Sequence, residues 1–236
     1  MDKLSRIQKT MLCYLGLATI FVLMGNSNNV PEIFAERIFK PIRGDSWRIH
    51  YSGLIVIVGI YYSLKQLNEM KKNSIIKTGF RRAIVTIVLI SVFTEIWVYG
   101  IQFYKGFSKD LNSIYLDREK TLVQLNGNED KVTIDGRIDI INCSNDEQEF
   151  YIKIKTPSLI KEGIRESYIT LENEFKVHPK EEKTLIINEE LKFYREIKYS
   201  GYSSEAFEYI LFNEKDETIF RGKLEEYQWD ELDSEN

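Results

Sequence analysis

The feature that most constrains what this chain can fold into is an apolar segment at residues 83–104, AIVTIVLISVFTEIWVYGIQFY, which carries a single charge. A helix that crosses a membrane needs about 17–25 mostly apolar residues, and this segment meets that length. Two uncharged segments, residues 10–25 and 49–64, fall about one residue short, although bilayer thinning and flanking basic side chains accommodate short spans. A buried core helix or strand is the alternative for each segment. We therefore expect a membrane α-helical bundle of three transmembrane helices, over residues 8–26, 47–66 and 82–105.

Charge divides the chain into two regions. Residues 1–104 hold 13 Lys and Arg against 6 Asp and Glu, whereas residues 105–236 hold 19 against 30. A basic front region that is poor in charge and an acidic back region that is rich in charge indicate two regions in two different solvents. Nucleic acid is not expected as a partner of the back region, because its excess negative charge repels phosphate.

The basic residues predict the sidedness of the three helices. The loop at residues 65–82 carries six Lys and Arg against one acid, and three basic residues precede the first apolar segment. Such basic segments stay on the cytoplasmic side of a membrane. We expect a multi-pass protein of the cell membrane, with a cytoplasmic amino terminus and 65–82 loop and an extracytoplasmic domain at residues 105–236. The first segment also resembles a signal peptide, but its long apolar run and the lack of a small-residue cleavage site favour an uncleaved helix.

Glu95 is the one ionisable residue inside the third apolar segment. A carboxyl group in a bilayer is costly when it faces lipid, so we expect it to face the helical bundle or another subunit. It could serve a proton- or cation-linked step or a polar contact to a partner subunit. The simpler alternative is a protonated side chain that only joins the helices. Gly16, Gly53 and Gly59 are candidate positions for close helix packing, because small residues let helix backbones approach.

From Thr121 onward the pattern changes to the alternation that is typical of strands. We expect strands at residues 121–125, 131–141, 149–156, 167–172, 174–178, 183–188, 205–213 and 217–224. This number of short strands with regular turns predicts an all-β antiparallel sandwich over residues 118–226, after a linker at 105–117 and before an acidic tail at 227–236. The layout resembles an immunoglobulin-like or fibronectin-like domain, without the paired cysteines and central tryptophan of antibody domains.

Candidate binding residues in the β-rich region are few. Tyr194, Tyr199 and Tyr202 lie in a stretch with Ser and Gly, a composition that is usual in recognition loops. Turn and core positions are the competing interpretation. The chain has two cysteines, Cys13 and Cys143, and two histidines, and this scarcity argues against disulfides, metal sites and histidine-based catalysis.

The sequence carries no pattern typical of a catalytic site. It has no Gly-rich phosphate loop, HExxH, CxxC or GxSxG motif, so we expect a protein that is not an enzyme and binds no cofactor. The favoured function is a binding or assembly subunit of a membrane or envelope complex. Its expected partners are the lipid bilayer and other membrane subunits or further copies of the chain. The alternative is a small oligomeric transport, channel or immunity-type protein that uses Glu95. The Ile-, Lys-, Glu- and Asn-rich composition resembles that of low-GC bacteria.

Overall fold

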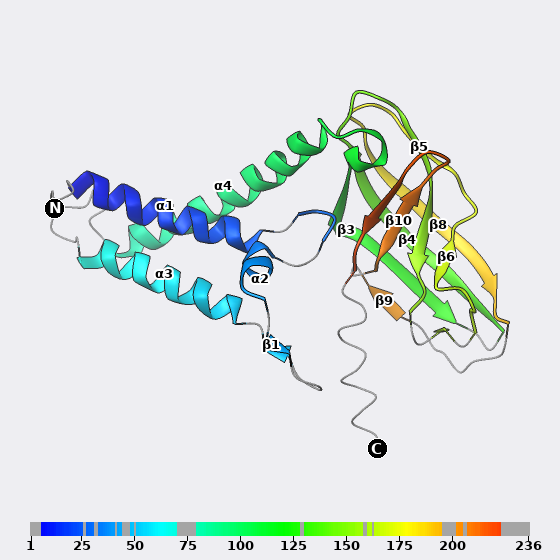
Figure 1. Cartoon of the computed structure of the whole chain (residues 1–236), viewed down its shortest axis with the longest axis horizontal. Coiled ribbons are helices and arrows are strands. Elements are labelled where there is room, and N and C mark those ends of the chain that lie inside the picture. Colours follow the sequence, from blue (N-terminus) through cyan, green and yellow to red (C-terminus); the bar gives the residue numbers. More distant parts are fainter. Residues whose placement is uncertain are drawn as a thin grey trace, which may run out of the picture. The chain divides into compact units, whose positions relative to one another are not determined.

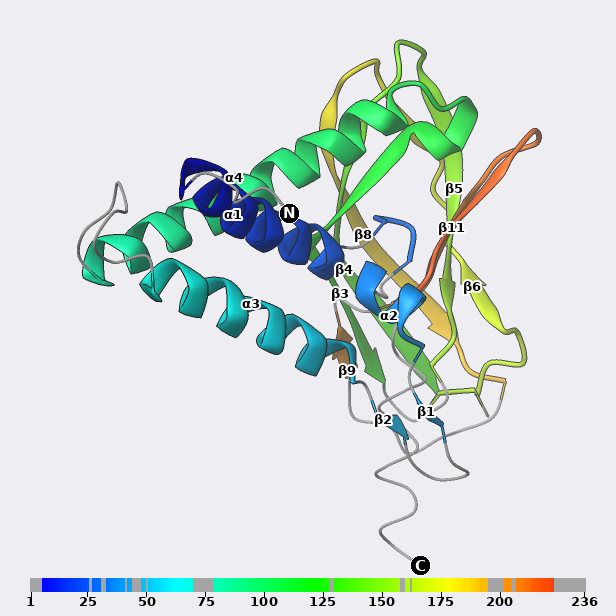
Figure 2. The ribbon, with the colours of Figure 1, turned by 60° about the vertical axis from the view of Figure 1, so that its left-hand side comes forward.

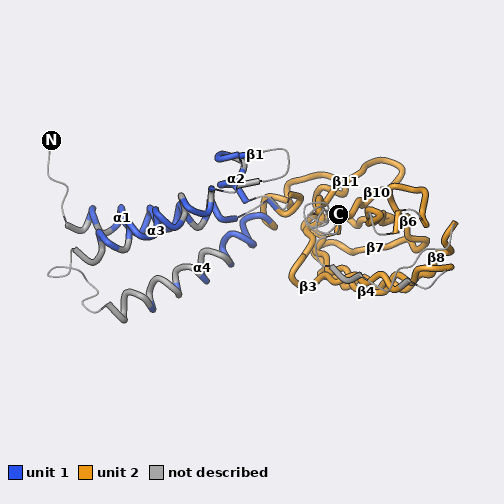
Figure 3. Tube along the Cα trace, turned by 90° about the horizontal axis from the view of Figure 1, so that it is seen from below, with its two compact units in different colours: residues 1–27, 32–101 blue, residues 28–31, 102–236 orange. Residues whose placement is uncertain are grey.

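The chain divides into two compact units (Figure 3). The helical unit comprises Met1–Ser27 and Glu32–Ile101, and the sandwich unit comprises Asn28–Pro31 and Gln102–Asn236. A short segment at residues 28–31 therefore belongs to the sandwich unit, although helical residues precede and follow it in the chain. The computed structural model describes residues 6–25, 27–30, 33–40, 42–43, 48–49, 51–69, 79–127, 130–157, 160–161, 163–194, 202–204 and 207–222.

Three long helices make up most of the helical unit (Figure 1). They are α1 (Arg6–Met24), α3 (Ser52–Glu69) and α4 (Gly79–Lys105). Helix α1 packs along α3, and the short helix α2 (Phe34–Ile38) contacts both of them. A small antiparallel pair, β1 (Ile42–Arg43) and β2 (Arg48–Ile49), follows α2 in the chain.

These helices do not support the membrane bundle that the sequence predicts. Within the described part of the chain, no helix has a stretch that is long and apolar enough to cross a membrane. The helices take in polar residues that border the apolar segments: α1 includes Arg6 and Lys9, and α3 continues through Lys65 to Glu69.

The predictions that rest on the bundle are contradicted with it. The transmembrane helices expected at residues 8–26, 47–66 and 82–105 are wrong as membrane spans, because the described helices fall short of what a span requires. The localisation as a multi-pass protein of the cell membrane has no support for the same reason. The sidedness predictions depended on those spans and lose their support with them. They placed the 65–82 loop on the cytoplasmic side and the β-rich region on the extracytoplasmic side.

Two antiparallel β-sheets form the sandwich unit (Figures 1 and 2). One sheet has the strand order β8-β4-β3-β9, and the other has the order β11-β10-β5-β6 with β7 also paired to β5. The first sheet consists of β3 (Ile114–Gly127), β4 (Lys131–Asn142), β8 (Glu182–Lys192) and β9 (Tyr202–Ser204). The second consists of β5 (Gln148–Lys155), β6 (Tyr168–Thr170), β7 (Phe175–Val177), β10 (Tyr209–Phe212) and β11 (Glu217–Phe220).

The hairpin of β3 and β4 is one of the two long pairings of the first sheet. Its register runs from Ile114 opposite Asn142 to Gly127 opposite Val132, with an irregularity between Asp117 and Leu122. Gly136 pairs with Val123 just past that irregularity. A Cβ atom at Gly136 would clash with the backbone of Leu122 and Val123, so glycine permits the close approach of the two strands.

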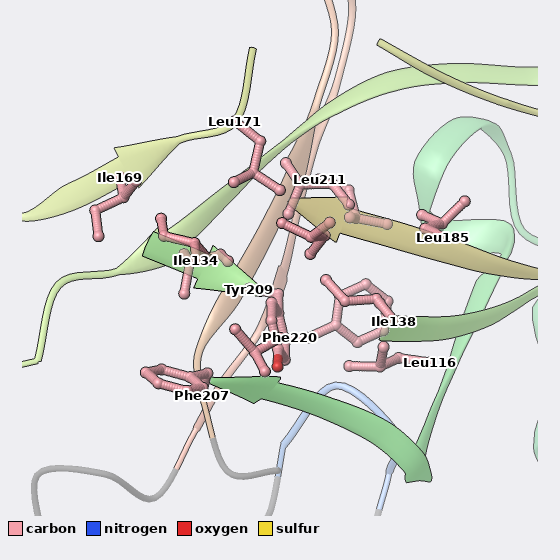
Figure 4. Close-up of a cluster of buried hydrophobic side chains, with 14 of the residues drawn as sticks. Leu116, Ile134, Ile138, Ile169, Leu171, Leu185, Phe207, Tyr209, Leu211 and Phe220 are labelled. Carbon is pink, nitrogen blue, oxygen red and sulfur yellow. The ribbon is translucent and has the colours of Figure 1, made fainter. Parts of the chain in front are cut away.

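The hydrophobic core lies between the two sheets (Figure 4). Side chains that alternate along a strand point to opposite faces of a sheet, so every second residue of each long strand reaches the core. Tyr209, Phe150, Phe207 and Phe220 are its largest fully buried members. Core residues come from both sheets, among them Leu116, Ile134, Ile138 and Leu185 from the first and Ile169, Leu211 and Phe220 from the second.

The ends of the sandwich differ from the ranges expected from the sequence. The 3-10 helix Asp110–Ser113 and the first residues of β3 lie in the stretch 105–117, which the sequence suggests as a linker. Leu111 and Ile114 in this stretch are fully buried in the core. The acidic tail expected at 227–236 lies outside the described residues.

Candidate interaction surface

A row of apolar side chains along one side of α4 is exposed. These side chains have between 44% and 71% of their surface accessible. We call them the α4 row: Ile84, Val88, Val92, Ile96, Tyr99 and Phe103. Contiguous exposed apolar surface of this kind commonly marks a place where another molecule binds.

Helix geometry brings the α4 row together on one side. An α-helix turns about 100° per residue, so spacings of three or four residues keep the row within an arc of about 120°. From Ile84 to Phe103 the row extends about 28 Å along the helix axis, at about 1.5 Å per residue. The row is therefore long enough to contact a second helix over several turns.

Trp97, on the side of α4 away from the α4 row, packs inside the helical unit. The Trp97 ring meets the Phe34 ring of α2 edge to face, with 5.3 Å between the ring centroids. A Cβ atom at Gly25 would lie 2.8 Å from the indole nitrogen of Trp97, so the glycine allows this close approach. Trp97 thus has packing partners, whereas the side chains of the α4 row are exposed.

Helices α1 and α3 also expose apolar side chains, but without an acid among those that the structure describes. On α3 the exposed apolar residues recur at helical spacing, and they are Leu54, Ile57, Val58, Tyr61 and Tyr62. On α1 they are Met11, Leu12, Leu15, Val22 and Met24. The α4 row differs from both sets because it surrounds an acidic residue.

Glu95 lies within the arc of the α4 row, between Val92 and Ile96 in the chain, and is exposed. Among the described residues, no hydrogen bond or ion pair involves Glu95. Its expected role in joining the helices of the chain therefore finds no contact in the part of the chain that the structure describes. A carboxyl group in an apolar surface is costly to bury without a partner, so any molecule that covers the row must satisfy it.

The three candidate packing glycines have different surroundings. At Gly59 of α3 a Cβ atom would lie 2.6 Å from Cδ1 of Ile20, and at Gly16 of α1 it would lie 3.6 Å from Oγ of Ser63. Both positions thus face the contact between α1 and α3. Gly53 has no other described atom within 4 Å of its Cβ position.

The candidate tyrosines do not form a cluster within the described part of the chain. Tyr194 is exposed and lies under the Arg165 guanidinium, 3.5 Å from the ring centroid to Cζ. Tyr202 lies on β9, opposite Leu125 of β3. Tyr199 lies outside the described residues. The cation–π contact of Tyr194 is a surface feature, and the binding loop stays a prediction.

The sequence interpretation missed a set of buried polar contacts that joins residues 28 and 29 to β3 and to the end of β11. The Asn28 amide pairs with the Leu116 backbone: its Nδ2 donates to the carbonyl oxygen at 2.6 Å, and its Oδ1 accepts from the N–H at 2.8 Å. The Asn29 carbonyl oxygen accepts from the Arg221 N–H at 2.9 Å. Residues 28 and 29 thus cover strand edges that would otherwise leave backbone groups unpaired.

Lys105, the last residue of α4, adds further hydrogen bonds to this set of contacts. Its Nζ donates to Oδ1 of Asn29 at 2.7 Å and to the Ile114 carbonyl oxygen at 2.8 Å, and it lies 5.1 Å from the centroid of the Phe220 ring. Burial in this site lowers the pKa of Lys105 to about 8. In the sequence Lys105 looks like an ordinary basic residue at the end of an apolar helix, because nothing local shows that residues 28 and 29 fold back to meet it.

The pKa of Lys105 predicts a pH dependence of stability. The folded state loses this proton near pH 8, whereas a lysine in the unfolded chain keeps it to about pH 10.4. Between these values the unfolded state binds more protons, so the free energy of unfolding rises with pH, by up to about 3 kcal/mol from this group. Urea denaturation between pH 7 and 10 should show this rise in the wild type and a smaller one in Lys105→Met. Parallel curves for the two proteins would contradict the prediction.

The described residues contain no group of three or more His, Cys, Asp or Glu side chains that could hold a metal ion. Cys143 is buried, and burial raises the pKa of its thiol, which disfavours the reactive thiolate. The α4 row is therefore the feature of the described residues that best defines a functional surface.

Comparison with known proteins adds no relative: no family model, curated protein or solved structure matches the chain. The resemblance to immunoglobulin-like and fibronectin-like domains remains one of sequence pattern.

Proposed function

We propose that this chain is a non-enzymatic assembly module that docks onto a helix of another subunit through the α4 row. The observation that carries the proposal is the outward-facing row itself, with six large apolar side chains on one side of a single helix. Burying them removes apolar surface from water, which is the main driving force of association.

The size of the row is adequate for a stable contact. A specific interface buries about 800 Å² on each partner, and aromatic side chains bury about 150–250 Å² each. Tyr99 and Phe103 are each about two thirds exposed, at 67% and 71%, and four aliphatic residues continue the surface. The row with its immediate flanks thus approaches the area of a standard interface.

No observation of comparable weight favours the alternative of a transport or channel protein that uses Glu95. Such a function needs a series of ionisable or polar groups along a path. Among the described residues, Glu95 has no ion-pair or hydrogen-bond partner that would begin such a series.

The proposal predicts that polar substitutions in the α4 row cause the native assembly to dissociate. Val92→Gln with Tyr99→Gln introduces a good helix former at both positions but removes apolar contact at the centre of the row. Central interface residues often contribute about 2 kcal/mol or more each, so association should weaken at least about 100-fold. Native size fractionation of the chain at its normal expression level measures this.

A matched control is available on the sandwich. Ile186 of β8 is also a large exposed apolar residue, at 68%, and Ile186→Thr keeps its branched side chain. We expect this variant to leave the assembly at its original size. If the α4 variant also keeps that size, or if the wild type is a lone monomer at native expression, the proposed function is wrong.

A further inference from the structure

We infer that the partner of the α4 row is the α4 row of a second copy of this chain, packed antiparallel about a two-fold axis between Glu95 and Ile96. This inference rests on the proposed function and names its partner. It comes from the order of residue sizes along the row and from the position of Glu95.

The α4 row is complementary to its own reverse. Val92 and Tyr99 lie at equal distances along α4 on either side of the point between Glu95 and Ile96, and so do Val88 and Phe103. Antiparallel pairing about this point therefore places each valine of one copy opposite an aromatic ring of the other. In a two-fold contact every such pair occurs twice, because residue i meets j and j meets i.

Parallel pairing of the same two helices fits less well. It would place Tyr99 against Tyr99 and Phe103 against Phe103 at one end, and valine against valine at the other. In the parallel arrangement, the paired aromatic rings would hold the helices apart at one end, and the paired valines would leave gaps at the other end. An aromatic ring that faces a valine fills the space between the helices evenly. Residue volume thus selects the antiparallel arrangement, and a row that matches its own reverse needs no other protein to cover it.

The axis brings the two Glu95 side chains together. Two carboxylates that share a site disfavour each other's charge, so the dimer holds a proton between them more readily than two separate monomers do. Tyr99, one turn along, is the nearest titratable side chain on the exposed side of α4, and no described residue of α1, α2 or α3 forms an ion pair with Glu95. Because the dimer binds more protons than the monomers, association should tighten as pH falls.

Sedimentation equilibrium of the purified full chain tests this inference, with Glu95→Gln as the variant. The amide of this variant keeps a polar group at the axis but carries no charge, so at pH 7.5 we expect its dissociation constant to be about ten-fold smaller than that of the wild type. The difference should shrink at pH 6. Glu214→Gln, which changes an exposed carboxylate of the sandwich, should leave association unchanged.

The contradicting outcomes separate the two proposals. Equal or weaker self-association of Glu95→Gln overturns the pairing at the axis. The purified wild type could stay monomeric while Val92→Gln with Tyr99→Gln still causes the native assembly to dissociate. That result would overturn the second copy as the partner, but it would leave the proposed assembly function supported. Flotation of single copies with phosphatidylcholine vesicles would show that the row contacts lipid, and it would also overturn this inference.

Discussion

Replacing Phe150 by alanine is expected to lower the free energy of unfolding of the sandwich unit by about 3–5 kcal/mol. Phe150 lies on β5, is fully buried and pairs in register with Phe175, with 6.3 Å between the ring centroids. Removing the ring takes away buried apolar surface and leaves a cavity that the two sheets cannot close, because close-packed cores relax only in part. A loss of this size is a large fraction of the total stability of a typical domain.

Urea denaturation of the full chain, followed by circular dichroism of the β-sheet signal, measures the loss. Phe107→Ala is the matched control, because it removes the same ring from a site that is 73% exposed. We expect this control to change the free energy of unfolding by less than about 1 kcal/mol. Similar losses for the two variants would show that Phe150 is not part of a packed core.

The second large effect is expected at Asn142, the last residue of β4. Its side chain is fully buried, and its Nδ2 donates to the carbonyl oxygens of Asp146 and His178 at 2.7 and 3.1 Å. Its Oδ1 accepts from the Ser144 Oγ and N–H at 2.8 and 3.1 Å. Asn142 thus connects the turn after β4 with the segment before β8.

Asn142→Ala should lower the free energy of unfolding by about 2–4 kcal/mol, because it removes several hydrogen bonds and leaves buried groups without partners. Asn145→Ala changes the same residue type three positions later, at an exposed position of the same turn. We expect it to be almost neutral. Thermal unfolding of both variants gives the comparison, and a neutral Asn142→Ala would mean that water replaces the bonds of the amide.

Local alternation predicted the long inner strands well. In β4, the buried Val132, Ile134, Ile138 and Ile140 alternate with more exposed residues, and this period of two is visible in the sequence. The first half of β3 was not predictable in the same way. Its charged run, residues 117–120, interrupts the alternation that Leu116 begins, and the register irregularity of the hairpin lies at the same place.

Contacts between distant segments could not be predicted from local pattern. Asn28 pairs with Leu116, 88 residues away, and no periodicity or motif marks that contact. The apolar runs indicated helical structure, but no described helix is long and apolar enough to cross a membrane, so the membrane interpretation is wrong. The exposed side of α4 could not be predicted either, because its segment is apolar all round and the contact of Trp97 with Phe34 joins residues 63 positions apart.

The position of Glu95 in the third helix was evident in the sequence, but its surroundings were not. The sequence suggested a contact with the other helices, whereas the structure exposes it within the α4 row. Its role depends on what covers that row.

Disulfide cross-linking between copies tests the central claim most directly. The background is Cys13→Ser, which leaves only the buried Cys143, and Val92→Cys and Tyr99→Cys are made in it as separate single variants. The antiparallel pairing predicts rapid cross-linking when the two variants are mixed and little in either alone, because residue 92 of one copy faces residue 99 of the other and facing cysteines meet the short reach of a disulfide. Cross-linking of each variant with itself, or of no combination, would contradict the claim.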